Sequence, residues 1–377
     1  SGAFSYVEVG TVIKKSGGEY SFLSQIYHPV IGYLSGWISL TVGFAAPIAL
    51  AVIAFTEYLP VTVAYPKVMG IALIAVITLI HSFNLNSSSK FQNITTLLKV
   101  LLVAVIIIIG LLLPEGRENA INFNKPYIGE ICSSFFAVGL IYISYSYSGW
   151  NAATYITEEF RSPRKALPIA LIGGTLLVTI LYTLLQFVFL KHVPLTELTG
   201  KLNVGTIAVE YMLGDQPAKI FSAAISLLLI SGISAMVWVG PRVTASIAKE
   251  HRLWNYFRSN SSGMPVRALW LQFSISAILL VSGTFEQIMI YCGVLLSISS
   301  LLVVGGTFVL RAKNDNSSVE GFKSPLFPLF QLFFIAISIW MISFTFINNL
   351  FECLIGLSNL VIGLGTYFLS NKRKREI

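Results

Sequence analysis

The sequence predicts an all-α integral membrane protein, because of its composition, its long apolar segments and the placement of its charges. Hydrophobic residues make up 55% of the 377 residues and charged residues only 11%, and the mean hydropathy is +0.77. Soluble domains carry about 25% charged residues. Here the charges fall in short clusters between long apolar segments. We therefore expect a single transmembrane transporter domain over residues 1–377, without a separate soluble domain.

Ten apolar segments are each close to or above the roughly 20 residues that cross the hydrocarbon core. They cover residues 33–58, 67–83, 91–113, 131–157, 165–190, 218–248, 266–283, 286–310, 325–347 and 351–370. Residues 1–13 are also apolar, but too few to span, and no initiating Met or signal-peptide pattern is present. We expect a partial helix there, so that the domain is incomplete at its N-terminus.

The basic residues predict the orientation in the membrane. If the partial first helix ends in the cytoplasm, most of the 25 Lys and Arg residues lie on the cytoplasmic side. Residues 371–377 (NKRKREI) then form a basic cytoplasmic tail, either a stop-transfer signal or a contact with anionic lipid. We expect a multi-pass protein of the plasma or inner membrane with a cytoplasmic C-terminus. The net charge of +8 belongs to these loops, so nucleic acid is not an expected partner.

No residue pattern indicates an enzyme, a cofactor or a metal site. The three cysteines, Cys132, Cys292 and Cys353, lie in or at apolar segments with no metal or disulfide spacing. The four histidines are scattered over loops and segment ends. No GxSxG, Walker, HExxH or GxGxxG pattern occurs.

Residues 131–168 carry the strongest functional signal. The apolar helix expected there is interrupted by polar and small residues before it resumes at Ala152. In hydrocarbon, irregular backbone is tolerated only where it faces a cavity or packed protein, and secondary transporters build substrate sites from broken helices. Alternatively, the same residues join neighbouring helices. The candidate substrate-binding residues are Tyr145, Ser146, Tyr147, Ser148, Gly149 and Asn151.

Lys99 is an isolated charge within the apolar segment 91–113. Such a charge is costly and is a functional hypothesis by default. A buried Lys also titrates readily, so it can carry a coupled proton. Alternatively, it extends to the cytoplasmic interface. Glu8 lies near the cytoplasmic end of the partial helix, and there we expect a structural contact with a neighbouring helix.

Residues 157–165 (TEEFRSPRK) form a charged cytoplasmic turn. Ion pairs between its acidic residues and nearby cations can stabilise one state of a gate. Alternatively, they are solvated pairs worth under about 1 kcal/mol each. The candidate gate residues are Glu158, Glu159, Arg161, Arg164 and Arg242.

Three segments resemble amino-acid permeases: SYVEVGTVIKKSGGEYSFL (5–23), YSGWNAATYITEEFRSPRKALPIA (147–170) and GPRVTASIAKEH (240–251). The chain is similar to the amino acid–polyamine–organocation (APC) superfamily, and most similar to its L-type amino-acid transporter branch. This resemblance implies the inverted-repeat (5+5) APC/LeuT-like transporter fold. The chain would begin inside the second helix and hold about ten full transmembrane helices plus one partial helix.

The resemblance also implies roles for individual residues. It places the helix break at residues 145–149, with Tyr145 where relatives carry an aromatic gate. Lys99 takes the place of a coupling sodium ion, and the other half of the site belongs to the absent first helix. The implied function is secondary active transport of amino acids by alternating access, as sodium-independent exchange or proton-coupled uptake. A sodium-coupled symporter of the same fold and a non-transporting membrane receptor or sensor stay open as alternatives.

The expected partners are an amino-acid substrate and membrane lipid. A neutral substrate is expected, because no acidic residue lies in the broken segment. The outer loop 59–67 lacks the cysteine through which animal L-type light chains join a heavy chain. A disulfide-linked heavy chain is therefore not expected.

Overall fold

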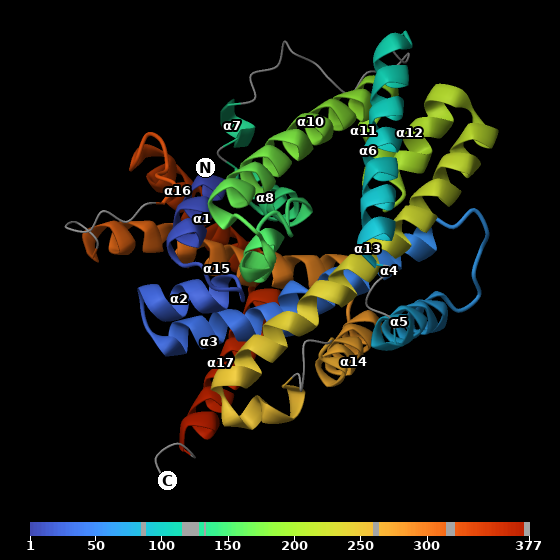
Figure 1. Ribbon diagram of the computed structural model, residues 1–377. Coiled ribbons are helices and arrows are strands. Elements are labelled where there is room, and N and C mark those ends of the chain that lie inside the picture. Colours follow the sequence, from blue (N-terminus) through green and yellow to red (C-terminus); the bar gives the residue numbers. More distant parts are fainter. Residues whose placement is uncertain (84–87, 115–127, 132, 259–263, 314–320, 373–377) are drawn as a thin grey trace.

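The computed structural model describes residues 1–372 except 84–87, 115–127, 132, 259–263 and 314–320, and all the regular secondary structure in these residues is helical (Figure 1). The first half contains α1 (Gly2–Val12), α2 (Glu19–Ile26), α3 (Pro29–Ile38), η1 (Ser39–Gly43), α4 (Ala45–Glu57), α5 (Pro66–Phe83), α6 (Ser88–Leu112), α7 (Ile128–Ile131), α8 (Ser134–Ser146), η2 (Ala152–Glu159) and α9 (Pro163–Pro168). The second half contains η3 (Ile169–Gly173), α10 (Gly174–His192), α11 (Leu195–Leu198), α12 (Val204–Leu213), α13 (Asp215–Glu250), η4 (Arg252–Phe257), α14 (Val266–Ser282), α15 (Phe285–Lys313), α16 (Leu329–Asn348) and α17 (Leu350–Lys372).

Eight helices in the described part of the chain are long and apolar enough to cross a membrane. They cover Pro29–Glu57, Pro66–Phe83, Gln92–Leu112, Pro163–His192, Asp215–Glu250, Phe285–Lys313, Leu329–Asn348 and Leu350–Ser370. The other two expected segments appear as shorter helices, since 131–157 is broken after α8 and 266–283 forms α14. The predicted all-helical, multi-span class is therefore confirmed. Residues 373–377 of the expected basic tail lie outside the described residues.

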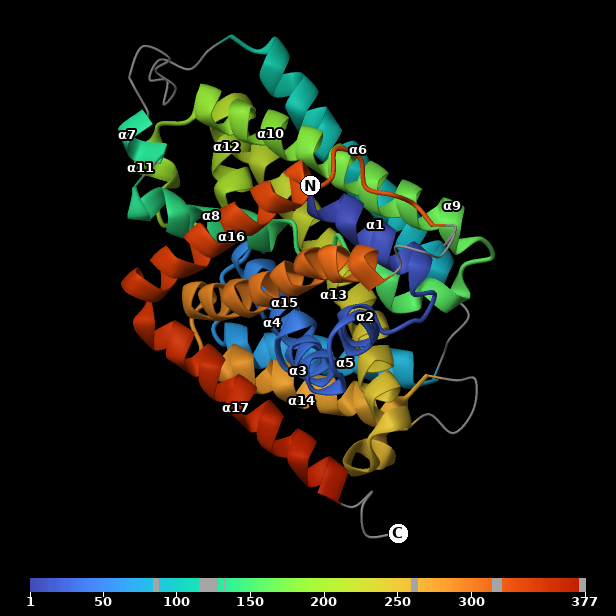
Figure 2. The same cartoon turned by 90° about the vertical axis from the view of Figure 1, so that its left-hand side faces the viewer.

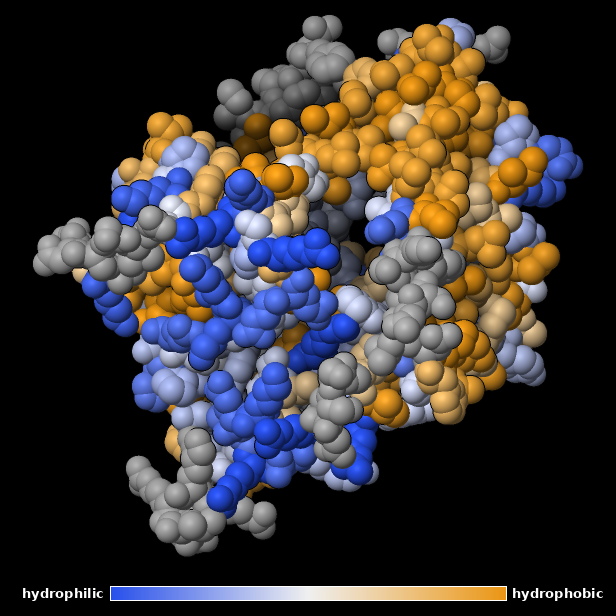
Figure 3. Space-filling view, in the orientation of Figure 1, coloured by the Kyte–Doolittle hydropathy of each residue, from blue (hydrophilic) through white to orange (hydrophobic). Residues whose placement is uncertain are grey.

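The helices form an enclosed centre and a lipid-facing exterior. α1 packs between α15, α9 and α2, and its Tyr6, Val7 and Val9 are fully buried. α17 runs along the outside of the molecule against α15 and α3 (Figure 2). In Figure 3 the apolar surface occupies the upper right. Hydrophilic side chains gather at the left and below, where α2, α3 and the C-terminal end of α13 lie. This division is typical of a protein with a membrane-embedded belt and a polar end.

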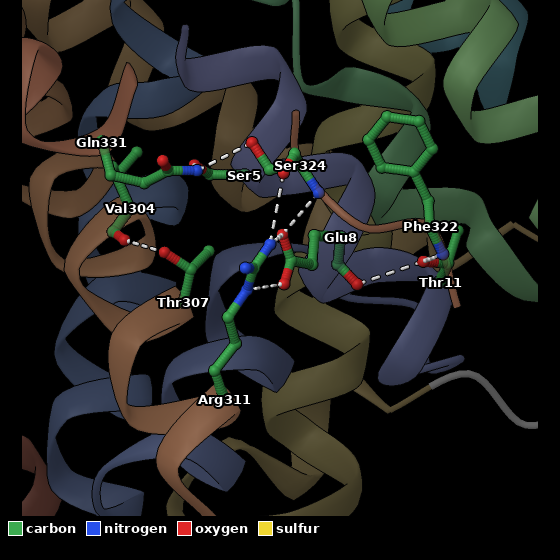
Figure 4. A network of polar contacts seen from close by, with 9 residues as sticks. All are labelled: Ser5, Glu8, Thr11, Val304, Thr307, Arg311, Phe322, Ser324 and Gln331. Atoms are coloured by element: carbon green, nitrogen blue, oxygen red, sulfur yellow. Dashed lines mark hydrogen bonds and ion pairs between the residues drawn. The ribbon is translucent and has the colours of Figure 1, made fainter. Parts of the chain in front are cut away.

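A partly buried ion pair fixes α1 to α15 (Figure 4). Arg311 of α15 donates from Nε to Glu8 Oε1 at 2.6 Å and from Nη2 to Glu8 Oε2 at 2.8 Å. The backbone N–H of Ser324 donates to Glu8 Oε2 at 2.8 Å, and that of Phe322 donates to Thr11 Oγ1 at 3.0 Å. Glu8 thus makes the structural contact expected of it, and it also holds the segment that leads into α16.

We expect Glu8→Gln to destabilise the full-length protein by about 3 kcal/mol, because Arg311 would lose the charge of its buried partner. The measurement is the thermal unfolding midpoint in detergent. The matched control is Asp215→Asn, which removes an exposed pair with Lys219 (2.6 Å, side chains 60% and 55% exposed) worth under about 1 kcal/mol. Equal shifts for the two variants would contradict this account of the Glu8 ion pair.

Candidate functional site

The helix that the sequence marks as interrupted is broken in the structure. α8 ends at Ser146, a turn covers residues 147–151, and η2 continues as a 3-10 helix. Within the turn, Ser148 N donates to Tyr145 O at 2.8 Å and Ala152 N donates to Gly149 O at 2.9 Å. Gly149 has φ +90°, a left-handed conformation that glycine adopts without strain. The sequence predicts that the apolar helix resumes at Ala152. The segment after the break is instead a short 3-10 helix with a non-helical backbone at Ile156 (φ −123°, ψ 27°).

A cavity of about 340 Å³ lies beside this break. Five of the six predicted substrate-binding residues line it: Tyr145, Tyr147, Ser148, Gly149 and Asn151. Ser146 does not, and its hydroxyl donates instead to the carbonyl oxygen of Ile143 at 2.7 Å. The break therefore forms one wall of a cavity, which is the arrangement that irregular backbone in hydrocarbon requires.

The other walls of the cavity come from helices that the sequence did not single out. α16 contributes apolar side chains, among them Phe334, Ile337 and Met341. α15 contributes the hydroxyl groups of Ser297 and Ser300. The cavity is thus amphipathic, with a polar side at the break and α15 and an apolar side at α16. A small molecule with a polar end and an apolar end fits such walls.

Glu19 is the acidic residue that sequence reasoning missed. Its carboxylate lines the cavity, and the residue is only 1% exposed. It accepts hydrogen bonds from the Tyr6 hydroxyl, from Asn151 Nδ2 at 3.1 Å and from Ser35 Oγ at 3.4 Å. α2, which carries Glu19, lies outside the candidate membrane spans. Burial raises the pKa of Glu19 to about 7, and these hydrogen bonds oppose the rise.

The two glycines before Glu19 place its side chain next to the helix break. Gly17 and Gly18 have φ of +106° and +56°, and their N–H groups donate to the carbonyls of Tyr155 and Thr154, both at 3.2 Å. A Cβ on Gly18 would lie 2.5 Å from the Tyr155 ring. The loop can therefore dock on η2 only with glycine at that position. The SGGE pattern was the available signal, but nothing local in it shows that Glu19 reaches the cavity.

Lys99 does not line the cavity. It stands midway along α6, and its Nζ lies 3.6 Å from where a Cβ on Gly232 of α13 would be. Gly232 is itself midway along α13. The ammonium group thus lies against a neighbouring helix at mid-length, away from both ends of α6.

The charged turn after the break is attached to α13. Arg242 Nε lies 3.2 Å from Glu159 Oε1, with side chains 24% and 51% exposed, and Arg242 also stacks on the Trp238 ring. The backbone N–H of Glu158 donates to Ser16 Oγ at 3.0 Å. Arg161 and Arg164 are exposed. Two of the predicted gate residues, Glu159 and Arg242, form an ion pair with each other.

Comparison with known proteins places the chain in a family. Residues 1–354 match the family model described as amino acid permease. The mouse "Large neutral amino acids transporter small subunit 2" is 29% identical over 386 residues, which is 98% of this chain and 71% of that protein. The rabbit "b(0,+)-type amino acid transporter 1" is 36% identical over 225 residues, 57% of this chain and 45% of that protein.

A bacterial relative extends the similarity along the chain. The "Serine/threonine exchanger SteT" of Bacillus subtilis (strain 168) is 24% identical over 385 residues, 99% of this chain and 86% of that protein. The resemblance expected from the three sequence segments is thereby confirmed. Because the family model covers almost the whole chain, the chain belongs to the amino acid permease family, whose members are multi-pass membrane transporters and not enzymes.

Proposed function

We propose that this permease carries neutral amino acids by alternating access, as a sodium-independent exchanger or a proton-coupled uptake system. The observation that carries the proposal is the cavity of about 340 Å³ bounded by the broken helix. Ligand pockets for small molecules begin at about 300 Å³. The space therefore suits one small amphipathic molecule.

The proposed substrate orientation follows from the charges of the walls. The C-terminal end of a helix carries a partial negative charge, so the end of α8 suits the substrate ammonium group. The apolar residues of α16, such as Phe334 and Met341, suit an uncharged side chain. Tyr145 lies at the end of α8 on the cavity wall, a position suited to a gate over the bound molecule.

A neutral substrate is favoured even though Glu19 lines the cavity. Its two oxygens already accept from Tyr6, Asn151 and Ser35, and the residue is 1% exposed. A cationic side chain would have to displace these donors to reach the carboxylate. The names of the mouse and Bacillus subtilis relatives also refer to neutral amino acids or to serine and threonine.

We further propose that Lys99 stands in for a coupling cation and that the Glu159–Arg242 pair stabilises one state of a cytoplasmic gate. The ammonium group of Lys99, at mid-length between α6 and α13, supplies a fixed positive charge inside the helix bundle. The ion pair ties η2 to α13, so breaking it would free the cytoplasmic end of the broken helix.

The same proposal covers the organisation of the protein in the membrane. Residues 1–377 act as one transporter domain, with a basic cytoplasmic tail at 371–377 and the C-terminus inside. Because residues 59–67 contain no cysteine, the permease works without a disulfide-linked heavy chain. Purification under non-reducing conditions tests this statement, because a disulfide-linked heavy chain would copurify with the permease.

Transport by the full-length protein in proteoliposomes is the direct test. We expect uptake of a radiolabelled neutral amino acid that is stimulated by internal amino acid or by an inward proton gradient, and that does not depend on sodium. Vesicles without protein are the control. Sodium-dependent uptake would favour the symporter alternative, and binding without any flux would favour a receptor.

Substitution of Gly149 should impair transport because of its backbone conformation alone. A Cβ at Gly149 meets nothing within 4 Å, but its φ of +90° strains any other residue by roughly 1–2 kcal/mol. We expect Gly149→Ala to reduce kcat/KM for transport by roughly 5–30-fold. Gly139→Ala is the matched control, because Gly139 also has open space but lies inside α8 with no positive φ. Equal effects of the two substitutions would contradict the role given to the break.

A further inference from the structure

The described residues that line the cavity include one ionisable carboxyl group, that of Glu19. The other titratable side chains on these walls are tyrosines. The transport mechanism outlined above gives Glu19 no task, since the substrate is placed against α8 and α16. A buried carboxyl group at a transport site with no assigned task calls for an explanation, because burial of an acid costs free energy unless it is matched by donors.

The surroundings of Glu19 are polar but uncharged. α1 presents Tyr6, α3 presents Ser35 and the turn presents Asn151, all as hydrogen-bond donors. The titratable groups that face it are Tyr6 and, from η2, Tyr155.

α15 adds Ser299, which bonds Ser35 at 3.1 Å, and Ser300, which bonds Tyr6 at 3.3 Å. The ion pairs formed within the described parts of the chain involve Glu8, Glu159 and Asp215, and none involves Glu19. Its negative charge is therefore balanced by neutral donors alone, and a proton is the cation that can reach it without rearranging the helices.

We propose that Glu19 is the proton-binding site of this permease and that its protonation loosens the cytoplasmic half of the broken helix. This inference rests on the proposed transport function and selects its proton-coupled form.

The chemistry of the carboxyl group links the proton to the helix. An ionised carboxylate only accepts hydrogen bonds, whereas the acid donates from its protonated oxygen. Asn151 and Tyr6 both donate to Oε1 of Glu19, so a proton added to that oxygen competes with both donors. Tyr6 has Ser300 as a second partner at 3.3 Å. Protonation therefore weakens both contacts, and the loss of the Asn151 contact is the one that acts on η2. The O–H bond to the added proton is the one covalent bond that forms.

Weakening the Asn151 contact acts on η2 directly. Asn151 directly precedes η2 as its N-cap residue, and at the other end Glu159 is paired with Arg242. With Glu19 ionised, η2 is held at both ends. With Glu19 protonated, it is held mainly at the Arg242 end and by the backbone contacts of Gly17 and Gly18. Proton binding and movement of the half-helix are thereby coupled through one hydrogen bond.

The test uses the full-length protein in proteoliposomes that contain a pH-sensitive dye. Substrate addition to the wild type should drive proton movement into the vesicles. Glu19→Gln keeps the shape of the acid but cannot titrate. We expect it to abolish substrate-dependent proton movement and proton-driven accumulation, and to retain amino-acid counterflow. The control is Glu197→Gln on the exposed helix α11, which should leave both measurements unchanged.

A second variant keeps the test decisive if Glu19→Gln does not fold. Tyr6→Phe removes a donor that stabilises the carboxylate, so the pKa of Glu19 should rise. The midpoint of the pH dependence of transport should then shift upward by about one unit. A merely structural role for Tyr6 would lower transport at all pH values without moving the midpoint.

Several results would overturn the inference. They are proton movement that persists in Glu19→Gln, a pH midpoint that does not move in Tyr6→Phe, and loss of proton movement in Lys99→Ala but not in Glu19→Gln. Counterflow by the wild type without any proton movement would overturn the role of Glu19 and leave the proposed transport function standing. Absence of counterflow in the wild type would contradict that function itself.

Discussion

A helix that ends inside a membrane leaves backbone carbonyl groups that water cannot reach, and they must be satisfied by protein or by a bound molecule. The break between α8 and η2 creates this demand near the centre of the molecule. The structure meets it with turn hydrogen bonds at residues 145–152 and with a cavity bounded by α1, α15 and α16. The surrounding helices are arranged around this space, and the ion pair of Glu8 with Arg311 fixes α1 beside it.

The short region around Gly17, Gly18 and Glu19 also supports the break. Gly17 and Gly18 let their loop dock on η2, and this places Glu19 within reach of Asn151. The start of the broken half-helix is therefore held by a buried carboxyl group, while its far end is held by an ion pair with α13. In the proposed mechanism, protonation of this carboxyl group alters the freedom of an element that lines the cavity.

The fold class and the position of the break follow from local features of the sequence. Hydropathy alone marks the spanning helices, and the polar residues 145–151 interrupt one of them. Glu19 and Ser297 could not be assigned in this way, because long-range packing brings them to the cavity from α2 and α15. Lys99 shows the opposite case: its charge is conspicuous in the sequence, yet its side chain lies against α13 and not on the cavity wall.

Protection of a cysteine at position 148 would test most directly whether the cavity beside the break binds the substrate. In the full-length protein with its native cysteines replaced, Ser148→Cys would be treated with a thiol reagent with and without a neutral amino acid. Ser282→Cys, exposed and outside the cavity, is the control. The account predicts that saturating amino acid slows modification at position 148 and not at 282. Equal rates with and without amino acid at position 148 would contradict it.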